Sequence, residues 1–112
     1  MTTVDKTNAL ITKWNKERDK LKETEAKMWK WLQTLLKRYY KKTKSTRILF
    51  RNTIRIPFEL HYYTGIEFDK DATKMNLITT SDVFFNSQRI HPGILIEVIK
   101  EVTEVVKEYD KK

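Results

Sequence analysis

The chain has 112 residues, no cysteine, two histidines and a formal net charge of +8. This length suggests one domain, which buries about two-thirds of its unfolded surface, so further burial in an oligomer would add stability. Without cysteines there is no disulfide and no thiolate metal site, and no apolar run is long enough for a signal peptide or a membrane span. We therefore expect a cytoplasmic protein with no membrane segment.

The first part of the chain, from about Asp5 to Lys42, predicts a long helix because it contains no Gly or Pro and is rich in Lys, Glu, Leu and Ala. Its apolar residues recur at heptad spacing, at Trp14, Leu21, Met28 and Leu35. A continuous helix would be about 57 Å long, more than one small domain can cover. We expect it to project from the body or to break near Thr24, and to pack on a partner protein, a symmetry mate or nucleic acid.

Positive charge is concentrated in the middle of the chain. Between Glu25 and Glu59 there is no acidic residue, whereas ten basic residues occur there: Lys27, Lys30, Lys37, Arg38, Lys41, Lys42, Lys44, Arg47, Arg51 and Arg55. A solvated surface usually mixes both signs of charge, but a field of one sign gains from counterion release on a polyanion. The basic interval between Glu25 and Glu59 therefore favours binding to nucleic acid. The alternatives are that it forms a solvated face or that it binds an acidic protein partner.

Two hairpins and a short helix are predicted next. Alternating apolar residues over 47–50 and 53–56 indicate a first hairpin with Asn52 in its turn, and residues 72–79 and 83–90 indicate a second around positions 80–82. Between them, Pro57 suits the first position of a helix, Glu59 faces its positive end, and Gly65 suits a left-handed cap. These signals predict a short helix from about Phe58 to Thr64.

The last segment predicts an amphipathic helix from Pro92 to about Tyr109. Its apolar side is continuous and too wide to remain in water, so it should pack on the sheet or on a dimer mate. That side consists of Ile94, Leu95, Val98, Ile99, Val102, Val105, Val106 and Tyr109.

The order I-P-F-E-L-H-Y-Y-T-G-I, followed by Phe68-Asp-Lys-Asp-Ala72, resembles the swapped-hairpin domain of the AbrB, SpoVT and MazE family over about residues 46–90. The resemblance implies a four-stranded core shared by two protomers, and DNA contact by basic residues of the first hairpin and the following helix. The sequence departs from the family where Thr53 stands at a turn position that commonly carries Arg, and where His61 and Tyr62 stand at positions that are frequently basic.

Together these features predict an α+β homodimer. It would have a basic helical extension over residues 1–44, an AbrB-like swapped-hairpin core with a short helix between its hairpins over 45–91, and the amphipathic helix over 92–112. The predicted function is a transcriptional regulator that binds double-stranded DNA. Lys37, Arg38, Lys41, Lys42, Lys44, Arg47 and Arg51 would contact phosphates, and Arg55 with His61 would reach base edges.

Other functions remain open. The same resemblance allows the antitoxin of a toxin pair, and the charge allows an architectural nucleic-acid-binding protein or a protein-interaction module that acts as an inhibitor. No phosphate-binding glycine loop, nucleophile with its base, paired carboxylates or metal-ligand spacing occurs in the sequence. We therefore expect no enzymatic activity, no cofactor and no bound metal.

Overall fold

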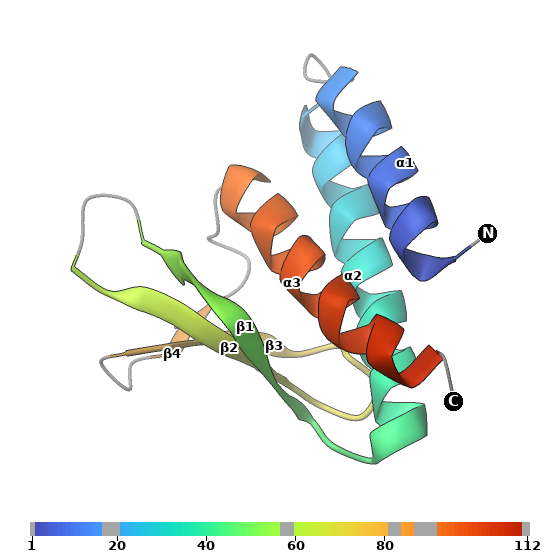
Figure 1. Ribbon diagram of the computed structural model, residues 1–112. Coiled ribbons are helices and arrows are strands. Elements are labelled where there is room, and N and C mark those ends of the chain that lie inside the picture. Colours follow the sequence, from blue (N-terminus) through green and yellow to red (C-terminus); the bar gives the residue numbers. More distant parts are fainter. Residues whose placement is uncertain (1, 17–20, 57–59, 81–83, 87–91, 111–112) are drawn as a thin grey trace.

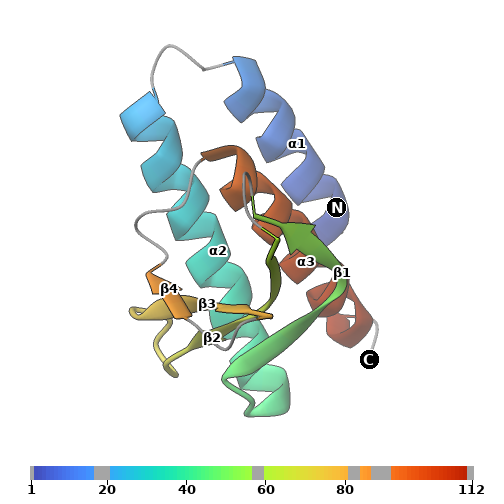
Figure 2. The same cartoon turned by 90° about the vertical axis from the view of Figure 1, so that its left-hand side faces the viewer.

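The computed structural model describes residues 2–16, 21–56, 60–80, 84–86 and 92–110. It is an α+β structure in which helices lie on one face of an antiparallel sheet (Figures 1 and 2). The helices are α1 (Thr3–Lys16), α2 (Leu21–Thr43) and α3 (Pro92–Asp110). The strands are β1 (Arg47–Arg55), β2 (Tyr62–Phe68), β3 (Met75–Thr79) and β4 (Phe84–Asn86).

The sheet contradicts the expected swapped-hairpin core. Its order is β1-β2-β3-β4, so each strand pairs with the next one along the same chain. The expected first hairpin is instead one continuous strand, because β1 pairs with β2 on both sides of Asn52, at Ile48 opposite Ile66 and at Ile54 opposite Tyr63. An irregularity between Leu49 and Ile54 absorbs the sequence that had indicated a turn. The second expected hairpin is present in part, as the antiparallel pair of β3 and the three-residue β4.

The prediction of a short helix over residues 58–64 is also wrong. Residues 62–64 belong to β2, which pairs with β1 on one side and β3 on the other, while Pro57, Phe58 and Glu59 lie outside the described residues. Gly65 has no positive φ and caps no helix. It lies opposite Leu49, and a Cβ built there would be 2.4 Å from the Ile48 carbonyl oxygen. Its small size therefore permits close approach of two strands.

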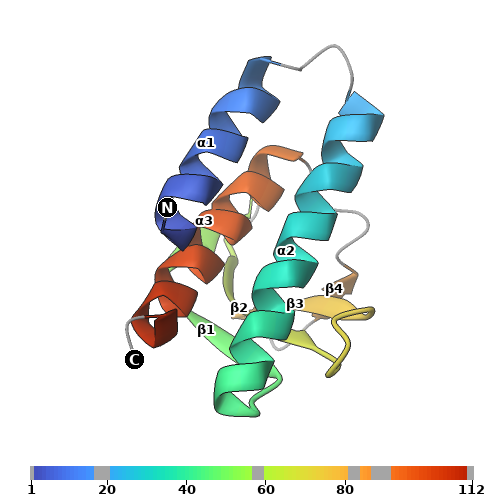
Figure 3. The ribbon, with the colours of Figure 1, turned by 90° about the vertical axis from the view of Figure 1, so that its right-hand side faces the viewer.

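The single long N-terminal helix is likewise wrong, because α1 ends at Lys16 and α2 begins at Leu21. The break does not fall near Thr24, which is buried within α2. The longest extent of the molecule is 37 Å, so a 57 Å helix could not fit. Instead α1 runs back alongside the body, with α3 between α1 and α2 and the sheet behind them (Figure 3).

One hydrophobic core joins these elements. Three of the four apolar residues expected at heptad spacing in the N-terminal region are buried, with Trp14 2% exposed, Met28 4% and Leu35 fully covered, while the side chain of Leu21 lies outside the described part of the structure. Helix α3 contributes a continuous apolar side at Leu95, Val98, Ile99, Val102 and Val106, as its sequence pattern indicated. None of the helices in the described part of the chain is long and apolar enough to cross a membrane.

A buried hydroxyl connects the three helices. Thr7 of α1 is 1% exposed; its oxygen accepts a 3.0 Å hydrogen bond from the Trp31 indole N–H of α2 and lies 3.2 Å from the Thr103 hydroxyl of α3. Thr103 donates to the Ile99 carbonyl at 2.7 Å, so the proton between the two threonines comes from Thr7. Buried polar groups that are fully paired fix one arrangement of the elements that carry them.

Replacing Thr7 by Val should lower the free energy of unfolding by about 1–3 kcal/mol, because the shape is kept while the buried Trp31 N–H loses its acceptor. Chemical denaturation followed by tryptophan fluorescence measures the change. Thr12→Val is the control, since Thr12 lies on the same helix, is exposed and donates to the Asn8 carbonyl. Equal effects of the two substitutions would contradict the assigned role of Thr7.

The turn between β2 and β3 is organised by Asp69. Its carboxylate accepts hydrogen bonds from the Lys74 N–H at 2.9 Å and from the Thr73 N–H and hydroxyl at 2.7 Å. These bonds, the one from Lys74 first, hold the pKa of the Asp69 carboxyl below its ordinary value of 3.8. Asp69 is therefore a turn residue.

A depressed pKa in the folded state means that Asp69 stabilises the protein above pH 3.8 and loses this contribution as the pH falls through its folded-state pKa. Asp69→Asn should therefore be less stable than wild type at pH 7, and the difference should shrink below pH 3.8. Thermal unfolding from pH 7 to pH 2 measures both proteins. Asp71→Asn, an exposed change in the same turn, should show no such convergence.

Candidate nucleic-acid interface

The exposed side of α2 carries a row of lysines. Lys27, Lys30, Lys37 and Lys41 are all exposed, and at 100° per residue they fall within one arc of the helix, away from the buried Leu32. We call these four residues the α2 lysine row. They span about 21 Å of helix, at 1.5 Å per residue. No acidic residue lies between Lys27 and the end of α2 at Thr43, and Glu23 precedes Lys27 by one turn on the same side of the helix.

The end of α2 adds two further exposed lysines, Lys42 and Lys44. Lys44 has the left-handed φ of 61°, its N–H donates to the Tyr40 carbonyl at 2.7 Å, and it thereby caps the helix. Its Nζ lies 5.4 Å from the centroid of the Tyr40 ring. Lysines here also interact favourably with the negative end of the helix dipole, so they have a structural role that is independent of any ligand.

The arginines that were expected to contact phosphates are engaged within the protein. Arg38 donates to the Thr3 hydroxyl at 2.8 Å and so ties α2 to α1. Arg47 pairs with Glu67 at 3.8 Å, and Arg51 pairs with Glu108 of α3. The two pairs are about half exposed, so a polyanion could compete for the arginines only by displacing a carboxylate.

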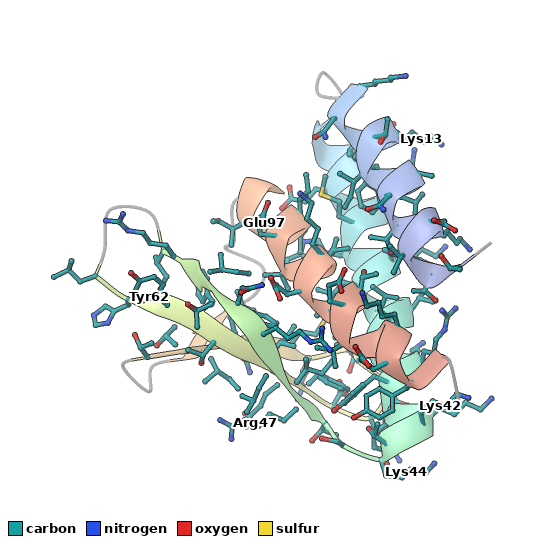
Figure 4. All side chains as sticks on the ribbon, viewed as in Figure 1. Lys13, Lys42, Lys44, Arg47, Tyr62 and Glu97 are labelled. Carbon is teal, nitrogen blue, oxygen red and sulfur yellow. The ribbon has the colours of Figure 1, made fainter. Side chains whose placement is uncertain are left out.

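Arg55 and His61 lie elsewhere. Arg55 is eight residues from Arg47 along β1, a distance of about 26 Å at 3.3 Å per residue, and it is paired with Tyr62 of β2. Figure 4 shows Tyr62 at the end of the sheet far from Lys42 and Lys44. The His61 Nδ1 is 3.5 Å from the Thr80 hydroxyl oxygen. These two residues therefore do not join the lysines of α2 in one surface.

Sequence reasoning missed part of the basic surface. Lys27 and Lys30 were not among the predicted site residues, although their spacing to Lys37 and Lys41 keeps all four on one side of a helix. Lys6 and Lys13 of α1 face the same region across a cavity between the two helices. No sequence signal could place those two, because their position depends on α1 running back beside α2.

The described residues hold no group of three or more His, Asp or Glu side chains that could bind a metal ion. Lysines dominate the exposed positions of α2 from Lys27 onward instead, and their chemistry is that of contact with anions.

Comparison with known proteins found no matching family model, no matching curated protein and no matching solved structure. The resemblance to the AbrB, SpoVT and MazE family therefore stays a prediction drawn from the sequence motif. The swapped-hairpin fold that it implied is the part that the sheet order contradicts.

Lys44→Gly should raise the free energy of unfolding by about 0.5–1 kcal/mol. The left-handed conformation is costly for a residue with a side chain, and this cost exceeds the entropy that glycine adds to the unfolded state. Thermal and chemical unfolding measure the gain. The same variant should bind duplex DNA more weakly if Lys44 contacts phosphate. A variant that is more stable and binds equally well would assign Lys44 to helix capping alone.

Proposed function

We propose that this protein binds duplex DNA through phosphate contacts made by the lysines of α2 and of the joint that follows it. The α2 lysine row carries this proposal: four exposed cations lie on one side of one helix, with no acidic residue between the first and the last. Duplex DNA has one negative charge per about 1.7 Å of its axis, so a 21 Å row meets many phosphates at once.

The lysines are better suited to this contact than the arginines of β1. Arg47 and Arg51 would have to leave Glu67 and Glu108, whereas Lys37, Lys41 and Lys42 have no recorded carboxylate partner within the described residues. Phosphate contacts set affinity and orientation without reading sequence. The role of a homodimeric transcriptional regulator is the more specific form of the proposal, and it requires in addition that two protomers associate and that one operator is preferred.

The first experiment is a fluorescence-anisotropy titration of a labelled random-sequence duplex over a salt series. If six phosphates are neutralised, log K against log salt should have a slope of about −5, from about −0.9 per contact. Lys41→Gln/Lys42→Gln should weaken binding at low salt and reduce the magnitude of the slope by about 2. Glutamine removes the charges without placing an acid at the helix C-terminus, where it would destabilise the helix.

The control is Lys70→Gln/Lys74→Gln, which removes the same charge from exposed positions in the β2–β3 turn. An equal loss in the control would mean that net charge, and not the lysines of α2, governs binding. Enrichment of one sequence from a genomic duplex pool, with a dimeric mass by light scattering, would support a regulator. Equal binding of all sequences would support an architectural protein, and no binding at low salt would overturn the proposal.

A further inference from the structure

A cavity of about 340 Å³ lies between α1 and α2. Residues of both helices line it, and both helices pack against α3. Figure 3 shows α3 between α1 and α2. Its volume is at the lower end of the range of about 300–1,000 Å³ that is typical of small-ligand pockets. Lys13, which lines the cavity, lies at the end of α1 far from Lys42 and Lys44 (Figure 4), so the cavity is separate from the C-terminal end of α2.

The lining combines an apolar wall with positive charge. Leu10 and the rings of Trp14 and Trp31 supply the apolar part, and four lysines surround it: Lys6 and Lys13 from α1, and Lys27 and Lys30 from α2. The Lys6 Nζ lies 4.9 Å from the centroid of the Trp31 ring. Among the described residues, no carboxylate lines the cavity. Such a lining favours a flat apolar body that carries negative charge.

Trp14 provides a second, independent observation. Its side chain is 2% exposed, yet its indole N–H has no hydrogen-bond partner among the residues that the structure describes. The other lining indole, that of Trp31, donates to Thr7. A buried tryptophan N–H normally finds an acceptor, and leaving one unpaired costs about 1–3 kcal/mol. The nitrogen itself has almost no accessible surface, so an acceptor atom of a ligand in the cavity reaches it only when the side chains that cover it move.

We propose that the cavity between α1 and α2 binds a small aromatic anion, whose ring packs against Trp14 and Trp31 and whose carboxylate or phosphate oxygens are held by the surrounding lysines. A movement of the covering side chains on binding lets the Trp14 N–H donate to an acceptor of this ligand. This inference goes beyond DNA binding and does not rest on it. Lys27 and Lys30 belong to both the cavity and the α2 lysine row, so an occupied cavity withdraws two cations from the row.

Binding is tested with 1-naphthoate, 1-naphthyl phosphate and the neutral 1-naphthamide as probes, by isothermal titration calorimetry. At least one anion should bind with a Kd below about 1 mM, and the amide at least about tenfold more weakly. The comparison of the two anions distinguishes a carboxylate site from a phosphate site. In the ¹H–¹⁵N spectrum, the indole peak that is absent from Trp14→Phe should shift as the favoured anion is added.

Lys13→Gln/Lys30→Gln should weaken binding of the favoured anion at least about tenfold, because both lysines line the cavity and are exposed enough to be replaced without loss of the fold. Lys70→Gln/Lys74→Gln, with the same change of net charge, should leave the affinity unchanged. Trp14→Phe keeps the ring and should weaken binding several-fold by removing the donor.

Three results would overturn the inference: no binding of either anion at about 5 mM, equal affinity for the amide, or equal loss in the two double-lysine variants. The DNA proposal is judged separately. Lys41 and Lys42 do not line the cavity, so Lys41→Gln/Lys42→Gln should leave anion binding intact. Lys13 lines the cavity but is not part of the α2 lysine row, so Lys13→Gln tests the cavity without changing the row.

Discussion

The hydroxyl of Thr7 sets the arrangement of the helices, because it is buried where α1, α2 and α3 meet and must satisfy two partners there. It accepts from the Trp31 indole and donates to Thr103, which in turn donates to the Ile99 carbonyl. Such a chain of bonds is satisfied in one relative placement of the helices, whereas apolar contacts alone would tolerate several. The position of α1, and every surface that α1 helps to form, follows from this constraint.

The placement of α1 gives the molecule two different basic features. On the solvent side of α2, lysines stand in a row with no acidic residue between Lys27 and Lys41, which is the electrostatic pattern of phosphate contact. Between α1 and α2, lysines from both helices surround Trp14 and Trp31, so charge and an apolar wall occur together. The arginines of β1 serve the fold instead, since their pairs with Glu67 and Glu108 tie the outer strand to β2 and α3.

The prediction of the fold was correct for the helices, whose apolar patterns are local in the sequence. It was wrong for the sheet, which depends on the pairing of strands with one another. The apolar side of α3 was visible in its sequence, and so was the apolar side of α2 that includes the buried Met28 and Leu35. The motif around Gly65 led to a wrong prediction. Its residues suit a short capped helix locally, but residues 62–68 pair with β1 and β3 and form a strand. Backbone hydrogen bonds to two neighbouring strands outweigh a helical turn of a few residues, which is unstable by itself.

The sequence by itself determined the helical character of the residues in α1, α2 and α3, the amphipathic side of α3, and the concentration of positive charge between Glu25 and Glu59, because these properties depend on composition and spacing along the chain. Only the tertiary structure decided that α1 folds back beside α2, that β1 runs through Asn52, and that Arg47 and Arg51 have carboxylate partners. It also decided the cavity beside Trp14. Each of these features depends on contacts between segments that are far apart in the sequence. Local sequence patterns do not indicate which distant segments will contact one another.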